Sequence, residues 1–317
     1  MNLGRLYVVI SCADRKRSLE HAPRLRDLPE GKKRDRRWWS AINSPTLPKH
    51  VGLDLYLGPY WSNVLSLVRQ AEMFGWTTQL WIISAGYGLV PASAQLSPYQ
   101  ATFAPGHPDS VSSLPGLEGR KASQNWWQNL SGLPSPAGNH PRTIEGLMAR
   151  DPSAAFLVAA SPAYLSAVEP DLLNGLNQLA DPNRLLVISG TPGPSPSTLQ
   201  ERWIPSLEIF RQDLGGACIT LNPRVAARAV YVARTIGWSA PELRKHFLLW
   251  SSILPPLEKP RRIPLSDNDV STFIQKQLVD SLHTSYTAML RQLRDMGLAC
   301  ERSRFKALFE LTRGVMA

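Results

Sequence analysis

Short apolar runs rich in β-branched residues recur along the chain, and each run ends in small or polar residues. The runs are Leu6–Ile10, Leu80–Ile83, Phe156–Ala160, Leu185–Ile188 and Ala217–Leu221. Because they lack alternation of apolar and polar positions, they are typical of strands buried on both faces of a parallel sheet. Apolar positions at helical spacing follow in Tyr60–Phe74, Pro162–Leu179 and Pro223–Ile236. This order predicts a three-layer α/β fold built around a parallel sheet with right-handed crossovers.

Two stretches interrupt the rhythm of strands and helices. Residues 15–50 are strongly basic and include the pair Trp38 and Trp39, and residues 97–142 are rich in Pro, Gly and Ser. Loops of this length inside a compact domain are usually functional, so we expect both near the site. Trp126 and Trp127, in the second stretch, are assigned to the core. For Trp38 and Trp39, core packing and insertion into nucleic acid stay open.

A proline-rich basic segment, residues 255–263, predicts a semi-rigid linker between an α/β domain of residues 1–254 and a C-terminal unit of residues 264–317. Three helices are expected in that unit. They run from Ser266 or Asp267 through Leu282, over Ser285–Met296, and over Arg302–Leu311, with a break at Gly297. The pattern is typical of a helix-turn-helix, and equally of a bundle that packs on the main domain or dimerises.

The net charge of +10 favours a polyanionic partner such as nucleic acid. No apolar run approaches the roughly 20 residues of a membrane-spanning helix, so we expect a cytoplasmic protein without a membrane partner. Cys12, Cys218 and Cys300 are scattered and show no metal-ligand spacing. His107 with Asp109, and His140, are the loop histidines on which any metal site would depend. Without a phosphate-binding loop or zinc motif, we expect no cofactor and no metal.

Chemistry in open α/β sheets gathers where strands end at their carboxyl edge. Small or hydroxylated residues follow each of four predicted strands, which predicts a crevice for a flat ligand. The residues expected to hold a base there are Ser11, Ser84, Gly86, Tyr99, Ser189 and Thr191. The glycines around Tyr87 do not fit a dinucleotide loop, because the third glycine is missing and Pro91 follows. We expect them to let the backbone approach a planar base, and we count Tyr87, which would stack on that base or close over it, among the catalytic residues.

Asp14 is the acid with the strongest catalytic prediction. It follows the first strand among Arg15, Lys16 and Arg17, whose charges favour an ionised carboxylate able to orient water and stabilise a cationic sugar. Capping of a turn or pairing with its basic neighbours is the alternative. Cys12 can act as a nucleophile beside cations, although a cysteine next to a buried strand is more often filler.

Two basic sets are the candidate DNA contacts. The first is Arg15, Lys16 and Arg17 after the first strand, and the second is Arg302, Arg304 and Lys306 on the last predicted helix. The partner expected from these sets is double-stranded DNA, bound by a monomer.

Three segments resemble the YaaA-like and archaeosine-synthase-like domains of bacterial and phage-associated proteins. They lie at residues 11–16, 55–61 and 81–103, and the last, with Gly86, Tyr87 and Ser97-Pro98-Tyr99, is the most specific. The resemblance implies a domain similar to uracil-DNA glycosylase, and some anti-phage relatives excise modified cytosines such as glucosylated hydroxymethylcytosine. Asp14 and residues 189–193 match the positions at which uracil-DNA glycosylases place water and press on DNA.

The resemblance therefore implies a DNA glycosylase that flips a modified base out of phage DNA and hydrolyses its glycosidic bond, as antiviral defence. This chain lacks the first motif and the His-Pro-Ser loop of the uracil enzymes, so uracil is not the expected substrate. Archaeosine-synthase-like relatives imply an alternative, chemistry on a 7-deazaguanine base with Cys12 attacking a nitrile. A non-catalytic sensor of modified DNA is the remaining alternative.

Overall fold

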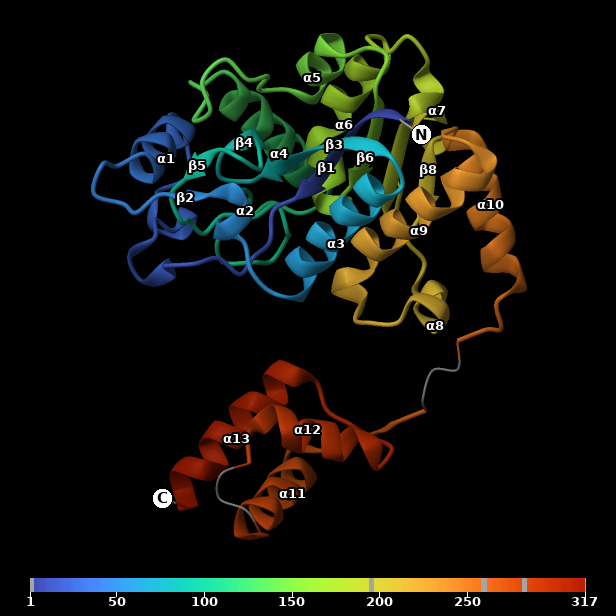
Figure 1. Cartoon of the computed structure of the whole chain (residues 1–317). Coiled ribbons are helices and arrows are strands. Elements are labelled where there is room, and N and C mark those ends of the chain that lie inside the picture. Colours follow the sequence, from blue (N-terminus) through green and yellow to red (C-terminus); the bar gives the residue numbers. More distant parts are fainter. Residues whose placement is uncertain (1–2, 194–196, 258–260, 281–283, 317) are drawn as a thin grey trace. The chain divides into compact units, whose positions relative to one another are not determined.

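The computed structural model describes residues 3–193, 197–257, 261–280 and 284–316. It divides the chain into two compact units, Met1–Leu254 and Pro255–Ala317, coloured blue to orange and orange to red in Figure 1. The division falls where the proline-rich segment begins.

The first unit is built around a six-stranded sheet with the order β4-β3-β1-β6-β7-β8. The strands are β1 (Gly4–Ser11), β3 (Trp76–Ser84), β4 (Gly88–Pro91), β6 (Ala155–Ala159), β7 (Leu185–Ser189) and β8 (Trp203–Pro205). All neighbouring pairs are parallel except β3 and β4. The five parallel strands follow the doubly wound order 2-1-3-4-5, in which the winding reverses between β1 and β6. The predicted α/β class with a parallel sheet is confirmed.

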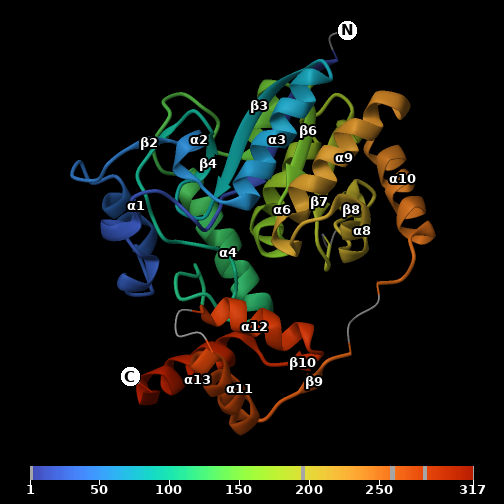
Figure 2. The same cartoon turned by 60° about the horizontal axis from the view of Figure 1, so that its bottom comes forward.

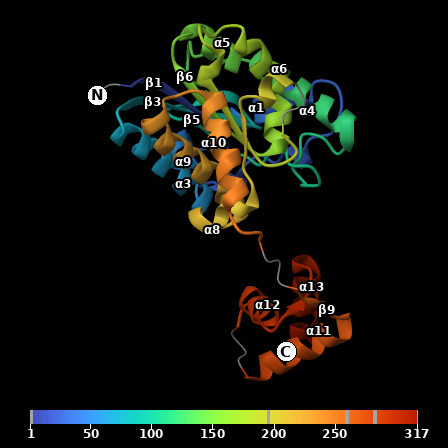
Figure 3. The ribbon, with the colours of Figure 1, turned by 90° about the vertical axis from the view of Figure 1, so that its right-hand side faces the viewer.

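Helices cover both faces of this sheet. They are α1 (Arg34–Ile42), α2 (Gly52–Leu55), α3 (Pro59–Met73), α4 (Gly116–Ser131), α5 (Ile144–Arg150), α6 (Pro162–Leu176), α7 (Ser197–Gln200), α8 (Arg211–Leu214), α9 (Leu221–Ile236) and α10 (Ala240–Ile253). Figure 3 shows α3, α9 and α10 on one face and α4, α5 and α6 on the other. A small ladder pairs β2 (His50–Val51) with β5 (Gln95–Leu96). The helices predicted after the first, third and fifth apolar runs correspond to α3, α6 and α9.

One predicted strand is wrong. The run Ala217–Leu221 forms a 3₁₀ turn at Cys218–Thr220 and continues directly into α9, whereas the last strand of the sheet is the three-residue β8. A short apolar run does not distinguish a strand from the start of a buried helix. Because β8 has so few residues, it gives no periodic signal.

The two long stretches predicted as loops contain helices. Helix α1 lies in the first stretch and places Trp38 in the core at 0% exposure, where its indole N–H donates to the Gly86 carbonyl at 2.9 Å. Helix α4 lies in the second and buries Trp126 and Trp127, as predicted for that pair. Most of the Pro and Gly residues that suggested a loop lie on either side of α4, and Gly116 and Gly119 lie in its first turn.

Asp171 of α6 joins three helices through its carboxylate. Its Oδ2 accepts the indole N–H of Trp127 at 3.0 Å and the Ile144 amide at 2.7 Å, and its Oδ1 accepts the Glu145 amide at 2.9 Å. These bonds satisfy the first turn of α5, whose amides have no helical partner.

We expect Asp171→Ala to lower the free energy of unfolding by about 3 kcal/mol, because a buried charged acceptor and three donors lose their partners. Urea denaturation measures this change. Glu20→Ala, which removes an exposed acid, is the control and should change stability by less than about 0.5 kcal/mol. Equal effects of the two substitutions would contradict this role for Asp171.

The described residues of the second unit form three helices and a short parallel ladder, drawn in orange to red in Figure 2. The helices are α11 (Asp267–Asp280), α12 (Tyr286–Asp295) and α13 (Arg302–Met316), and β9 (Ile263–Pro264) pairs with β10 (Leu298–Ala299). The Ser285 hydroxyl caps α12 by accepting the Ala288 amide, and Gly297 has a φ of 77° where α12 ends. The predicted helices correspond to these three, although Leu282 lies outside the described residues.

Candidate active site at the carboxyl edge of the sheet

Cys12 lies where the winding of the sheet reverses, directly after β1. Its Sγ is 3.3 Å from the hydroxyl oxygen of Tyr164 in α6, the helix that follows β6. The same hydroxyl is 3.2 Å from Oγ1 of Thr102. These contacts connect β1, α6 and the segment after β5 at the point where open α/β proteins bind ligands. Cys12 is buried, as expected for a cysteine that only fills space in the core. Its contact with the Tyr164 hydroxyl, however, is a polar interaction that such a role does not require.

Buried tyrosine hydroxyls continue this polar cluster. The hydroxyls of Tyr56 and Tyr99 are 3.0 Å apart, and that of Tyr99 is 2.6 Å from Oγ of Ser84 at the end of β3. Burial raises the pKa of Tyr56, Tyr99 and Tyr164 well above the ordinary tyrosine value. All three are therefore neutral hydrogen-bond donors at neutral pH.

Lys16 brings a cation into the cluster. Lys16 is only 6% exposed. Its ammonium lies 4.4 Å from the ring centroid of Tyr99 and 5.8 Å from that of Tyr56. The ammonium donates to the Asp14 carbonyl at 3.2 Å. Among the described residues, no carboxylate lies within 4.0 Å of it. Burial lowers the pKa of Lys16, because the charged form loses hydration, and the nearby Cys12, Asp14 and Asp109 offset this effect only in part.

The backbone around Lys16 explains why it is buried while its neighbours are not. Lys16 forms an antiparallel bridge with Tyr56, the Arg17 amide donates to Leu55 at 3.0 Å, and the Leu57 amide donates to Arg15 at 2.9 Å. In an extended segment, successive side chains point to opposite sides. Arg15 and Arg17 are therefore exposed, and Lys16 is directed inward. The prediction that all three contact DNA is corrected for Lys16, which belongs to the buried cluster.

Asp14 is exposed and lies two residues after Cys12. Among the described residues, its carboxylate forms no ion pair with Arg15, Lys16 or Arg17. The predicted alternative, in which Asp14 only pairs with its basic neighbours, is therefore not observed. Its backbone carbonyl holds the ammonium of Lys16. An accessible carboxylate and a buried cation thus belong to the same short segment after β1.

The residues of the turn between β3 and β4 form hydrogen bonds within the protein. The Ser84 hydroxyl accepts the amides of Gly86 at 3.2 Å and Tyr87 at 2.9 Å. A Cβ at Gly86 would lie 2.6 Å from the Tyr99 ring, so this glycine makes room for Tyr99. The Tyr87 hydroxyl donates to the Ile42 carbonyl at 3.0 Å, and the residue is 1% exposed. The expected roles of Gly86 in approaching a base and of Tyr87 in stacking on it are therefore replaced by packing roles, and Tyr99 is likewise buried.

The other predicted base-binding residues lie along the same edge. The Ser11 hydroxyl is 2.9 Å from the Tyr60 hydroxyl. Ser189 ends β7, two strands from β1 and hence about 10 Å away. Its buried hydroxyl has no hydrogen-bond partner among the described residues, whereas Thr191 is exposed. Ser11 directly precedes Cys12 in the chain, and the Ser189 hydroxyl is a buried polar group without a partner in the described part of the chain.

The loop histidine and aspartate predicted as the basis of any metal site have other contacts. Asp109 is fully buried, and its carboxylate accepts a hydrogen bond from Nε of Arg26 at 2.8 Å. The ring Nδ1 of His107 accepts a hydrogen bond from the backbone amide of Asp109 at 3.0 Å. Across the described ranges, no group of three or more His, Cys, Asp or Glu side chains is placed to hold a metal ion. The helices in these ranges also include none that is both long and apolar enough to cross a membrane.

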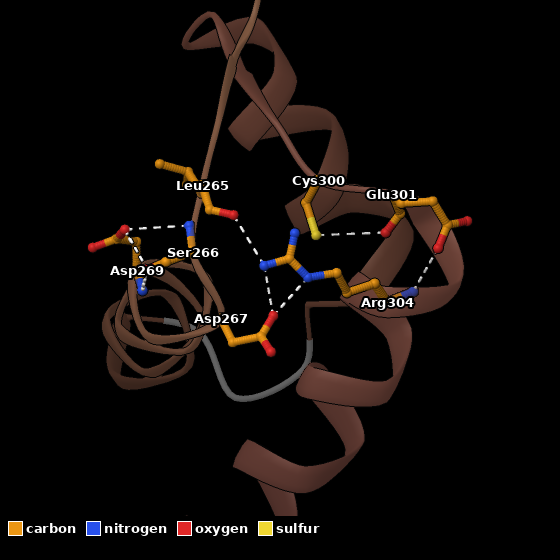
Figure 4. Close-up of polar contacts among 7 residues, drawn as sticks. All are labelled: Leu265, Ser266, Asp267, Asp269, Cys300, Glu301 and Arg304. Carbon is orange, nitrogen blue, oxygen red and sulfur yellow. Dashed lines mark hydrogen bonds and ion pairs between the residues drawn. The ribbon is translucent and has the colours of Figure 1, made fainter.

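The three basic residues predicted to contact DNA from the C-terminal unit have different surroundings. Arg304 forms an ion pair with Asp267 at 2.5 Å and donates to the Leu265 carbonyl at 3.0 Å, as Figure 4 shows. Lys306 lies 3.5 Å from the Glu310 carboxylate. Arg302 has no ion pair among the described residues, and its guanidinium donates to the Tyr286 hydroxyl at 3.3 Å.

Tyr56, Thr102 and Tyr164 are cluster residues that were not predicted as site residues. Tyr164 lies in the segment Ser161-Pro162-Ala163-Tyr164, which directly follows the predicted strand Phe156–Ala160. Tyr56 lies in the Leu55–Trp61 motif. Position after a strand was therefore an available signal for Tyr164, but the pairing of residues 15–17 with 55–57 that positions Tyr56 has no signature in the sequence.

Comparisons of the chain with protein-family models, curated proteins and solved structures found no match.

Proposed function

We propose that this protein is a DNA glycosylase that removes a modified base by hydrolysing its N-glycosidic bond. The observation that supports this most strongly is the segment after β1, where the exposed Asp14 adjoins the buried ammonium of Lys16, which has no ion-pair partner among the described residues. Glycosidic cleavage develops positive charge on the sugar and negative charge on the departing base. A carboxylate and a cation in one short segment offer a partner for each charge.

The reaction assigns a role to each group. As the bond between C1′ and the base nitrogen breaks, its electron pair leaves with the base and the sugar becomes an oxocarbenium ion. Asp14 stabilises that ion and accepts a proton from the water that adds to C1′. Lys16 stabilises the departing base, whose nitrogen finally takes a proton from solvent while Asp14 returns its proton to solvent. No cofactor enters this sequence, and the products are a free base and an abasic site.

Base entry requires movement of the segment around Lys16, because the residue is buried. A glycosylase must in any case flip its target base out of the duplex. The resemblance of residues 11–16, 55–61 and 81–103 to YaaA-like and archaeosine-synthase-like domains, and through them to the uracil-DNA glycosylase fold, supports a modified cytosine of phage DNA as the substrate. Antiviral defence in the cytoplasm is the role that follows.

The test uses DNA containing glucosylated hydroxymethylcytosine beside unmodified DNA of the same sequence. We expect alkali-labile abasic sites in the modified DNA only, and mass spectrometry should detect the released base. Absence of abasic sites in every modified DNA tested would overturn the glycosylase proposal.

A second candidate function is chemistry on a 7-deazaguanine base, and the contact between Cys12 and Tyr164 favours it. The Cys12 thiol would add across the nitrile: its sulfur bonds to the carbon, a tyrosine hydroxyl gives its proton to the nitrogen, and the thiol proton restores the tyrosine. An amine co-substrate would then displace the thiol from this thioimidate, leaving an amidine on the base. Nucleoside composition analysis distinguishes the two candidates. This reaction leaves a changed base in the nucleic acid, whereas a glycosylase leaves a missing one.

A further inference from the structure

Four arginines line a hollow of about 330 Å³ in the C-terminal unit. Arg262 directly precedes β9, Arg291 and Arg294 lie on α12, and Arg302 begins α13. Asp295 is the acidic residue that lines the hollow with them. Three segments that are separate in the sequence thus bring guanidinium groups to one place.

The charges of these arginines are not balanced within the unit. Among the described residues, none of the four is in an ion pair, in contrast to Arg304 with Asp267 and to Lys306 with Glu310. Figure 4 shows that the guanidinium of Arg304 contacts both the Asp267 carboxylate and the Leu265 carbonyl. The unit therefore neutralises one part of its basic surface and leaves the hollow positive.

Neutral acceptors orient three of the four guanidiniums. Arg262 donates to the Arg294 carbonyl at 3.2 Å, and Arg294 donates to the Cys300 carbonyl at 3.3 Å. Arg302 donates to the Tyr286 hydroxyl at 3.3 Å. Each of these bonds uses one donor and leaves the positive charge and the remaining N–H groups for a ligand. Like charges held together repel one another, and an anion in the hollow relieves that repulsion.

We propose that this hollow binds the phosphodiester backbone of duplex DNA, which deepens the DNA-directed function proposed above but does not depend on base excision. Arginine matches phosphate oxygens through paired N–H donors, and phosphate contacts position a protein on the duplex. Arg291 and Arg294 share one face of α12, since they are three residues apart. In a helix-turn-helix the first helix crosses the backbone while the next helix enters the major groove, and α12 followed by α13 fits this order.

The test measures binding of the full-length protein to a fluorescent, unmodified DNA duplex over a range of salt concentrations. Arg262→Glu/Arg291→Glu should weaken binding tenfold or more and lower the magnitude of the log-log salt slope by about two, roughly one for each lost phosphate contact. Arg291→Glu alone should act in the same direction with about half the change in slope. Neither substitution removes a buried side chain, and thermal unfolding checks that each variant is folded.

Lys276→Glu is the matched control, because Lys276 is an exposed residue of α11 that does not line the hollow. The same reversal of charge there should change duplex affinity less than twofold. Equal losses for Lys276→Glu and the double variant, or unchanged affinity of the folded double variant, overturn the proposal. Inorganic phosphate is added at constant ionic strength as a small-anion probe. If phosphate binds the wild type but not Arg291→Glu, and both proteins keep the same duplex affinity, the hollow is a small-anion site only and the proposal is overturned.

A short single-stranded modified oligonucleotide separates this proposal from the glycosylase proposal. The hollow variants should keep base excision on that substrate while losing duplex affinity. If no base is excised from any substrate but the variants still lose duplex affinity and salt slope, the glycosylase proposal fails and the backbone site stands. If excision occurs and duplex affinity is unaffected by the variants, the backbone site fails alone.

Discussion

Replacing Lys16 by methionine is expected to make the protein more stable and to lower the proposed base-excision activity strongly. Methionine keeps the length and apolar stem of the side chain and removes a buried cation that has no carboxylate partner within ion-pair distance among the described residues. Replacing a buried charge by an apolar group of similar volume typically stabilises a protein, here by about 1 to 3 kcal/mol. The cation is retained at a cost in stability, which is characteristic of functional sites.

The activity of Lys16→Met should fall at least about a hundredfold, the usual effect of removing one electrostatic group that stabilises a transition state. Urea denaturation and the abasic-site assay measure the two effects on the same preparation. Lys49→Met, which removes an exposed lysine, is the control and should leave both stability and activity near those of the wild type. A Lys16→Met protein that is less stable yet fully active would contradict this interpretation.

The stability gain of Lys16→Met should also depend on pH. Burial lowers the pKa of Lys16 in the folded protein, whereas in the unfolded chain the residue keeps its ordinary pKa. Between the two values the unfolded state binds more protons than the native state, so the stability of the wild type rises with pH. The difference in the free energy of unfolding between variant and wild type should therefore shrink as pH rises from about 7 to about 10.

The parallel sheet could be predicted from the sequence because its strands are continuous apolar runs. Leu6–Ile10, Phe156–Ala160 and Leu185–Ile188 correspond to β1, β6 and β7 within one or two residues. The same signal failed at Ala217–Leu221, where the run leads into α9, and it missed β8, whose residues Trp203–Pro205 are too few to show a pattern. Strand order was not predictable, because it depends on long-range pairing that a local pattern does not record.

The candidate site was predicted in position but only partly in composition. Cys12 and Asp14 follow β1 as expected, since the end of a strand is a local feature. The burial of Lys16 could not be predicted, because it requires the pairing of residues 15–17 with residues 55–57. In a run of three basic residues, composition indicates an exposed patch, whereas an extended backbone directs the middle residue inward. Tyr87 was misassigned for a similar reason, since its hydroxyl is bound by Ile42 from α1, a helix not expected in that stretch.

The buried tyrosine hydroxyls around Lys16 are neutral, so the positive charge of the lysine dominates the electrostatics of the site. The raised pKa values of Tyr56, Tyr99 and Tyr164 keep these side chains neutral, so they donate hydrogen bonds without balancing the lysine charge. A ligand that carries or develops negative charge is therefore the missing partner of the cluster. The departing base of a glycosidic cleavage meets that description, and so does the nitrogen of a nitrile under attack by Cys12.

Asp14→Asn is expected to leave duplex binding intact while lowering base excision by about a hundredfold to a thousandfold. Asparagine has nearly the same shape and still accepts a hydrogen bond, but it carries no charge to stabilise an oxocarbenium ion or to take a proton from water. Single-turnover rates of base release and duplex affinity are the two measurements. Asp54→Asn is the matched control, because Asp54 is also exposed and adjoins the segment that pairs with residues 15–17.

The same substitution separates the three functional classes when it is combined with Cys12→Ser. A glycosylase loses base release in Asp14→Asn and retains it in Cys12→Ser, because the thiol has no role in water attack. An enzyme that adds Cys12 to a nitrile shows the reverse, since serine is a much poorer nucleophile without a base to activate it. A sensor of modified DNA keeps binding and its biological effect in both variants. Full base release by Asp14→Asn would remove the carboxylate from the mechanism and leave Lys16 as the residue on which the chemistry depends.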